Sequence, residues 1–451
     1  MDARVLIISY HFYPDHAVGA KRMSELAREL VAAGCRVTVL TVAKNGQQDP
    51  ALLTRVDGVE IIGVPQPPKL LRKVLPYLRR QRNAESAVAS AESAQHPVAA
   101  ETESRIERLK RWYHSLEWLV DDNKAWAWRT WRRAVMLGLE RPFDCVISSG
   151  PPHSAHLAAR WAKPWLRAPW IMDLRDPWTD DSEWRAHVHS RASRWINRRF
   201  ESNALCKADQ VIATTPGLAA RLQLRFPRKQ EAIDTVYNGY DEAVQALPPS
   251  PRGELRLLYA GSLYYNRDPF PLLSAVAKLV DDPAVDRRKV RFSLVGNCSD
   301  WQGRPLVPWI EEHGLADCIG VRPPVSPDAV GKLLAEANVL VNFAQGQPRQ
   351  IPAKMFEYIA AGREMLLLTE RESDSARLAL TAKAGRVVEP GDVDELVRTL
   401  RDLYRFYVEQ AQVYQAEAAE VALFSREQQN ARLIQLIDTY RARSLAPEAQ
   451  S

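Results

Sequence analysis

Two series of short apolar segments, each alternating with helix-sized stretches, constrain the fold of this chain more than any other feature. The first series covers 5–9, 37–41, 59–64, 145–148, 170–172 and 211–213, and the second covers 255–259, 290–295, 339–343 and 365–368. Short apolar runs are typical of strands buried on both faces, and helical connections between them favour parallel pairing. The sequence therefore predicts an α/β fold with two doubly wound parallel sheets.

A proline-rich stretch separates the two series. Residues 247–251 read Leu-Pro-Pro-Ser-Pro, and a chain of 451 residues is long enough for two domains with separate cores. We predict a first domain over 1–246, a linker at 247–253 and a second domain over 254–424. The helical tail 425–451 is expected to pack back toward the first domain.

The first domain carries a basic and aromatic insert at about 66–131. Leucines in 69–82 share one helical face, surrounded by Lys and Arg without an acid, and 112–131 is rich in tryptophan. This composition suits peripheral contact with an anionic membrane, and a solvated charged face over a core stripe explains it equally well. The net charge is +6, but no recognised nucleic-acid module accompanies it, so no nucleic acid is expected as a partner.

The N-terminus and the cysteines bear on the compartment. The chain enters an apolar, strand-like segment at Val5 without the cleavage region of a signal peptide, and no apolar run is long enough to span a bilayer. We therefore expect a cytoplasmic protein. Its cysteines have no paired spacing and are expected to be reduced and to bind no zinc: Cys35, Cys145, Cys206, Cys298 and Cys318.

Two segments of the second half are candidates for anion binding. In 258–269 a strand is followed by Gly261, Arg267 and the expected helix cap Asp268, although an ordinary turn with a solvent-facing arginine explains this segment alone at least as well. In 350–362, Lys354 and Glu357 lie one helical turn apart. A lysine there can neutralise a phosphate and a glutamate can accept both hydroxyls of a ribose, whereas the competing interpretation is a surface ion pair.

His153 and His156 follow a strand of the first half and have a spacing that suggests a metal site. No third ligand accompanies them, and His156 suits the helix core. We therefore expect a binding or orienting role for His153 and no metal.

Seven motifs together resemble glycosyltransferase family 4 over nearly the whole chain. They are His11-Phe12-Tyr13-Pro14-Asp15 with Gly19-Ala20-Lys21-Arg22, then 34–41, Asp173-Leu174-Arg175-Asp176-Pro177-Trp178, 237–241, 259–269, Ala353-Lys354-Met355-Phe356-Glu357-Tyr358 and 388–392. The resemblance implies a GT-B fold, in which two Rossmann-like domains face a central cleft. It also implies retaining, metal-independent transfer of a sugar from a nucleotide diphosphate.

The resemblance assigns roles to matched positions. Arg267 and Lys354 would bind the donor diphosphate, Glu357 the ribose diol, and the backbone at Val321 and Arg322 the nucleobase. The full set of implied donor-binding residues is Gly19, Arg22, Gly261, Ser262, Arg267, Val321, Arg322, Lys354 and Glu357. The first domain would bind the acceptor, with His153, Arg175 and Asp176 as candidate catalytic residues. No cofactor is expected beside the nucleotide sugar.

The chain departs from the family pattern at three positions. Arg349 replaces a glutamate that commonly contacts the transferred sugar, and Ser262 replaces the basic residue that commonly follows the loop glycine. Arg175 stands where a histidine is often found, and a guanidinium cannot act as a base, although it can stabilise developing charge.

The expected activity is glycosyl transfer to a lipid-linked or polysaccharide-precursor acceptor, by an enzyme peripheral to the inner face of the cytoplasmic membrane. A nucleotide-sugar epimerase of the same fold and a catalytically inactive membrane scaffold remain alternatives. A nicotinamide dehydrogenase is disfavoured, because no three-glycine fingerprint follows the first strand.

Overall fold

A computed structural model describes residues 3–15, 17–43, 53–67, 119–179, 190–241, 251–264 and 266–445. The chain divides into two compact units, Met1–Val211 and Ile212–Ser451. Residues 247–250 of the predicted linker lie outside the described residues. The predicted domain boundary therefore stays a prediction.

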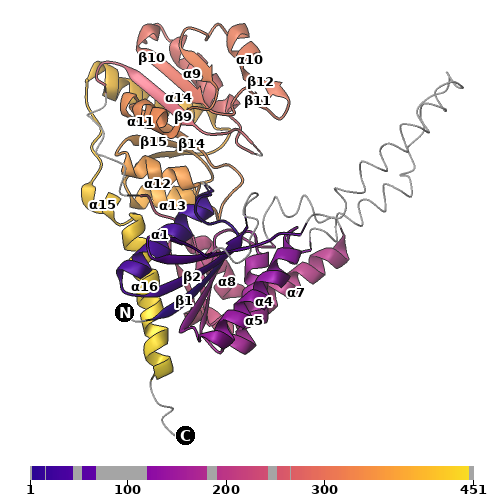
Figure 1. The fold of residues 1–451 in the computed structure, drawn as a ribbon. Helices are drawn as coiled ribbons and strands as arrows, with labels where there is room; N and C mark the ends of the chain where they lie inside the picture. Colours follow the sequence, from indigo (N-terminus) through magenta and orange to yellow (C-terminus); the bar gives the residue numbers. More distant parts are fainter. Residues whose placement is uncertain are drawn as a thin grey trace, which may run out of the picture. The chain divides into compact units, whose positions relative to one another are not determined.

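The first sheet has eight strands in the order β3-β4-β2-β1-β5-β6-β7-β8. Its strands β1 and β2 are labelled in Figure 1. Their bounds are β1 Arg4–Ser9, β2 Arg36–Val42, β3 Leu53–Val56, β4 Val59–Val64, β5 Cys145–Gly150, β6 Trp170–Leu174, β7 Gln210–Ala213 and β8 Ile233–Thr235. β1 pairs in parallel with β2 on one side and β5 on the other, and its residues Val5 to Ile8 have no exposed surface. The parallel core of this sheet confirms the predicted fold class.

One antiparallel edge strand was not predicted. β3 pairs antiparallel with β4 through the turn Asp57-Gly58, where φ is +51° and +81°. An Asp-Gly pair with positive φ at both residues is a strong signal for a two-residue hairpin. The Asp57-Gly58 turn therefore indicates a hairpin that includes β3. The strand itself could not be predicted from its apolar pattern, because it is short and weakly apolar.

Helices connect the strands of the first sheet. Their bounds are α1 Val18–Ala32, α4 Lys124–Glu140, α5 Ser154–Leu166, α7 Arg191–Lys207 and α8 Pro216–Arg225. α4 and α5 pack side by side (Figure 1). The buried carboxylate of Asp121 accepts a hydrogen bond from the backbone N–H of Ser154 at 2.7 Å, which fixes the start of α5.

The second sheet has six strands in the order β13-β10-β9-β14-β15-β16, and a separate hairpin joins β11 and β12. The strand bounds are β9 Leu255–Ala260, β10 Val290–Val295, β11 Asp300–Trp301, β12 Arg304–Pro305, β13 Ile319–Arg322, β14 Val339–Phe343, β15 Glu364–Leu368 and β16 Gly385–Val388. Alternate residues enter two different cores: Leu257 and Tyr259 pack in one, and Leu258 packs in the other. A sheet covered on both faces requires this arrangement.

The helices of the second unit beyond α8 are α9 Phe270–Val280, α10 Leu306–Glu312, α11 Pro327–Glu336, α12 Ala353–Ala360, α13 Asp374–Thr381, α14 Val393–Tyr404, α15 Ala418–Ala422 and α16 Arg426–Leu445. The predicted caps Ser326 and Asp392 accept hydrogen bonds from the third following backbone N–H, as expected. α9 begins two residues after the predicted cap, because Asp268 bonds the N–H of Phe270 across a tight turn instead.

The C-terminal helix is anchored by its first turn. Arg426 donates to the carboxylate of Asp241 at 2.5 Å and to the carbonyl of Asn238 at 2.6 Å. Gln429 accepts from the backbone N–H of Tyr237 at 2.9 Å. These contacts hold α16 against the segment that follows β8.

Much of the predicted insert, 68–118, lies outside the described residues, including all of 69–82. Of the tryptophans in its described part, Trp126 is fully buried, whereas Trp128 is 48% exposed. In the part of the chain that the structure describes, no helix is both long and apolar enough to cross a bilayer. The five cysteines form no disulfide bond.

Candidate functional site

Two loops approach each other at the carboxyl ends of β9 and β10. Gly261 follows β9 and Gly296 follows β10. A Cβ atom on Gly296 would lie 2.0 Å from the carbonyl oxygen of Gly261, and Gly296 has a φ of +130°. Only glycine therefore fits at position 296. In open α/β sheets this edge is the usual place for a ligand.

Lys354 brings a buried cation to this edge. It lies in the first turn of α12, and its Nζ is 3.7 Å from the ring centroid of Tyr259. A Cβ on Gly261 would come within 3.1 Å of the same atom. The Nζ is buried without a hydrogen-bond partner among the described residues, although other atoms of the side chain are partly exposed. Burial, followed by the charge of Arg267, holds the pKa of Lys354 well below its usual value.

Arg267 supplies a second cation. Its guanidinium carbon lies 3.9 Å from the ring centroid of Tyr264, and its Nη1 donates to the carbonyl of Ser262 at 3.4 Å. The residue is only 8% exposed, and within the described part of the chain its Nε has no partner. Arg267 is therefore not the solvent-facing arginine of an ordinary turn.

Among the described residues, no carboxylate is hydrogen-bonded to Lys354 Nζ or to Arg267 Nε. Glu357, the competing partner of Lys354, is exposed and forms no hydrogen bond with Lys354 Nζ, and its charge opposes the lowering of the pKa of Lys354 less strongly than burial causes it. Buried charges of one sign are costly unless something pairs with them. A bound dianion, such as a diphosphate, would satisfy the free N–H groups and offset the charge. The arrangement excludes the surface ion pair as the explanation for Lys354 and Glu357.

The predicted donor residues Ser262, Val321 and Arg322 lie in the same unit as Lys354 and Arg267. Ser262 accepts from Asn297 at its hydroxyl, at 3.2 Å, and its carbonyl accepts from Tyr259. Val321 and Arg322 end β13, where the carbonyl of Arg322 accepts from the N–H of Gly296 at 3.0 Å. Nothing in these contacts tests a nucleobase or ribose role, which stays a prediction for these residues and for Glu357.

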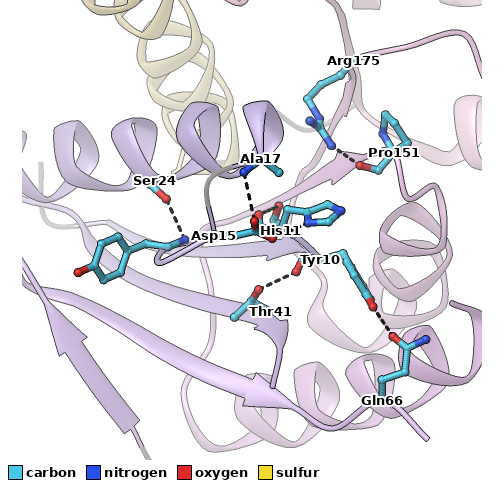
Figure 2. Close-up of polar contacts among 11 residues, drawn as sticks. Tyr10, His11, Asp15, Ala17, Ser24, Thr41, Gln66, Pro151 and Arg175 are labelled. Atoms are coloured by element: carbon cyan, nitrogen blue, oxygen red, sulfur yellow. Dashed lines mark hydrogen bonds and ion pairs between the residues drawn. The ribbon is translucent and has the colours of Figure 1, made fainter. Parts of the chain in front are cut away.

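In the first unit, a histidine and an aspartate pair in the loop after β1. His11 Nδ1 lies 2.7 Å from the carboxylate of Asp15, and the other oxygen of Asp15 accepts from the N–H of Ala17 at 3.1 Å (Figure 2). Both side chains are about one-third exposed, at 33% and 29%. This pair leaves the second imidazole nitrogen directed away from Asp15, so it can meet a ligand.

Gly19 and Arg175 are brought together across the same edge. A Cβ on Gly19, in the first turn of α1, would lie 1.7 Å from the guanidinium of Arg175. Arg175 donates to the carbonyl of Pro151 (Figure 2). Burial lowers the pKa of Arg175, and the neighbouring Asp176 acts in the opposite direction. In this structure the space left by Gly19 admits Arg175, whereas its predicted approach to a phosphate remains untested.

Arg22 forms a buried ion pair. Its Nη2 donates to Asp173 at 2.8 Å and its Nε to both carboxylate oxygens at 3.2 Å, with side chains 2% and 0% exposed. Ser149 donates to the same carboxylate at 2.7 Å. This geometry is that of a group that ties α1 to β5 and β6. The predicted donor contact of Arg22 stays a prediction.

His153 and His156 share a buried aromatic cluster with Trp178. The His153 ring stacks on Trp178 at a centroid distance of 4.7 Å and an angle of 9°. His156 Nδ1 lies 2.8 Å from the hydroxyl of Ser148. Burial lowers the pKa of both, to about 3 for His156, so each is neutral near pH 7. No group of three metal-ligating side chains occurs anywhere in the described residues.

Comparison with known proteins decides the family. A model described as a glycosyl transferase 4-like domain matches residues 19–239, and one described as glycosyl transferases group 1 matches residues 254–405. The chain belongs to glycosyltransferase family 4. No protein with a curated description matches its sequence significantly.

Solved structures of low sequence identity share the GT-B fold of this glycosyltransferase. Sucrose-phosphate synthase from Thermosynechococcus elongatus has 16% identity and a TM-score of 0.62, covering 98% of this chain and 100% of its own. HepE from Anabaena, in complex with UDP-glucose, has 13% identity and a TM-score of 0.59, covering 97% and 100%. The lipopolysaccharide outer core galactosyltransferase WaaB has 13% identity and a TM-score of 0.59, covering 97% and 99%. The predicted fold of two Rossmann-like domains is confirmed.

Sequence reasoning assigned no role to three groups that the structure of this glycosyltransferase places at its strand ends. These are Tyr259 under Lys354, the pair of His11 and Asp15, and Trp178 against His153. The pair had a detectable signal, because a histidine and an aspartate four residues apart follow a strand. Tyr259 and Trp178 gave none, since aromatic residues at strand ends are common in cores.

Proposed function

We propose that this glycosyltransferase moves a sugar from a nucleotide diphosphate sugar to a lipid-linked or polysaccharide-precursor acceptor. The observation that carries the proposal is the pair of buried basic groups, Lys354 Nζ beside Gly261 and Arg267 against the carbonyl of Ser262, of which Nζ and Nε have no hydrogen-bond partner among the described residues. A diphosphate is the anion whose charge and size suit two such groups. The structure of HepE with UDP-glucose shows that a protein of this fold binds such a donor.

In the proposed donor complex, Lys354 and Arg267 contact the diphosphate, and Ser262 and the Gly261 backbone lie against it. Glu357 accepts the ribose hydroxyls, one helical turn beyond Lys354. The backbone at Val321 and Arg322 contacts the nucleobase.

The proposed chemistry needs charge stabilisation more than a base. As the anomeric bond breaks, negative charge grows on the leaving diphosphate, and two desolvated cations stabilise that charge without a metal. The acceptor hydroxyl attacks the face that the leaving group vacates, so configuration is retained. We assign the acceptor to the first unit, with neutral His153 as an orienting group and Arg175 and Asp176 as charged groups at the acceptor. Arg175 keeps its proton and so orients rather than deprotonates.

We also propose that the enzyme works at the cytoplasmic face of a membrane. The support is compositional: residues 69–82 are basic and apolar, and 112–131 are rich in tryptophan. Of this second segment, the described Trp128 is exposed next to Arg132. Such a surface suits peripheral contact with anionic lipid.

A thermal-shift panel tests the donor assignment. Uridine, guanosine and deoxythymidine diphosphate sugars are each added to the full chain, and one of them should raise the unfolding temperature, because it binds only the native state. Lys354→Ala and Glu357→Ala should lose that shift and sugar transfer, while Lys278→Ala, which removes an exposed lysine of α9, should keep both. Wild-type shift and turnover in both site variants would refute the assignment. Sugar interconversion without an acceptor would favour the epimerase, and binding without turnover the scaffold.

A further inference from the structure

The first unit contains a pocket that the proposed reaction does not use. It has a volume of about 420 Å³ and lies between the end of β4 and one face of α4. Its lining residues are Ile62, Gly63, Val64, Pro65, Trp128, Arg129, Arg132, Arg133 and Met136. The β4 residues form an apolar wall, and the α4 residues bring charge and an aromatic ring.

The described residues that line this pocket carry only positive charge. Three of them are arginines and none has a carboxylate. Arg129 donates to the carbonyl of Pro65 at 3.2 Å, which fixes its side chain at the wall. No ion pair within the described part of the chain involves Arg132 or Arg133, so their N–H groups are available to a ligand. Guanidinium groups bind phosphate through paired hydrogen bonds.

The pocket is also apolar at its opening. Trp128 and Met136 are 48% and 51% exposed, so both side chains present apolar surface to a ligand. Trp128, Arg132 and Met136 are spaced four residues apart, so they share one face of α4. The guanidinium carbon of Arg132 lies 4.9 Å from the Trp128 ring centroid. A ligand that suits this face needs a phosphate and an apolar chain in one molecule.

We propose that this pocket binds the phosphate head group of a single lipid molecule. The phosphate contacts Arg132 and Arg133, and the first part of the acyl or isoprenoid chain lies along Trp128 and Met136. A free inorganic phosphate would leave the apolar half of the site unused, and a zwitterionic lipid would bring a second cation among the arginines. The inference deepens the proposed contact with anionic lipid and rests on it, whereas it does not depend on the proposed transfer reaction.

Calorimetric titration of the full chain with dihexanoyl phosphatidic acid, kept monomeric, tests the site. Dihexanoyl phosphatidylcholine and inorganic phosphate are the comparison ligands. Phosphatidic acid should bind at least about tenfold more tightly than either, a difference of about 1.4 kcal/mol, because inorganic phosphate lacks the apolar chain and phosphatidylcholine brings a cation among the arginines. The double variant Arg132→Glu/Arg133→Glu should lose this preference. Trp128→Ala should weaken the binding of phosphatidic acid more than it weakens the binding of inorganic phosphate.

Arg198→Glu/Arg199→Glu is the matched control, since it makes the same charge change beside an exposed tryptophan, Trp195, on α7. This variant should bind phosphatidic acid as the wild type does. Equal losses in the two double variants would show unspecific charge attraction and overturn the proposal. Equal binding of phosphate and phosphatidic acid would show an adventitious ion only, and equal binding of the two lipids would show no head-group recognition; each result overturns it. Unfolding temperatures within the wild-type range exclude misfolding as the cause.

Discussion

Lys354→Met is the most informative change, because it should raise the stability of the free protein and remove its response to donor. Methionine has an unbranched side chain one heavy atom shorter than that of lysine, and it carries no charge. An unpaired buried polar group costs at least about 1 to 3 kcal/mol, and the contact of Nζ with the Tyr259 ring returns about 0.5 to 2 kcal/mol. We therefore expect a net gain of about 1 kcal/mol, or roughly 2 to 4 °C in the melting temperature of a unit of this size.

Thermal unfolding of the full chain, with and without a nucleotide diphosphate, measures both effects. The wild type should be less stable than Lys354→Met when free and should gain stability with the nucleotide, whereas the variant should gain little. Lys278→Met is the control, because Lys278 forms only an exposed ion pair with Asp394 and its loss should change neither quantity. A free variant that melts below the wild type, or one that responds normally to the nucleotide, would refute the reasoning.

The pH dependence of the same comparison has a fixed sign. The pKa of Lys354 is lower in the folded chain than the ordinary 10.5 of an exposed lysine. Between these two pKa values the unfolded chain holds a proton that the folded chain has released, so wild-type stability rises with pH in this window. The advantage of Lys354→Met should shrink over the same window. An advantage that stays constant up to pH 10.5 would show that Lys354 is not desolvated.

Two further predictions concern packing and acid stability. Gly296→Ala should lower the free energy of unfolding in urea by about 2 to 4 kcal/mol, because its Cβ would meet the Gly261 carbonyl oxygen at a φ of +130°. Gly303→Ala, at an open position, should lower it less, and equal losses would contradict the close approach of the two loops. His156 has a pKa of about 3 when folded against 6.5 for the free side chain, so its contribution is complete above pH 6.5 and is lost toward pH 3, at about 1.4 kcal/mol per pH unit. His156→Gln should flatten this slope, and an unchanged slope would assign it to other groups.

The positions of the strands were predictable because burial on both faces leaves a simple pattern. β4, β10 and β14 have the residue bounds that the apolar runs predicted. The helix start at Ser326 was predictable for a local reason as well, since a capping side chain bonds a backbone N–H three residues away. The start of α9 differs from the prediction, because the side chain of Asp268 can accept a hydrogen bond either in a tight turn or at a helix start.

The candidate site was only partly predictable. The spacing of Lys354 and Glu357 placed both on one helix, and the motifs marked Gly261 and Arg267. The sequence could not tell a surface ion pair from a buried cation, because burial of Nζ depends on Tyr259 and on the loop at Gly261, about a hundred residues away. The same holds for Arg22, whose partner Asp173 is separated from it by 151 residues.

The sequence by itself determined the fold class, the family and the residue types available at each strand end, because periodicity, capping and motif spacing are local properties of the chain. The tertiary structure decided which charges are paired. It gave Arg22 an acid and placed the guanidinium of Arg175 against Gly19, and within the described residues it left Lys354 Nζ and Arg267 Nε without a hydrogen-bond partner. Electrostatic energy depends on distance and burial, and both are fixed only when segments far apart in the sequence pack together.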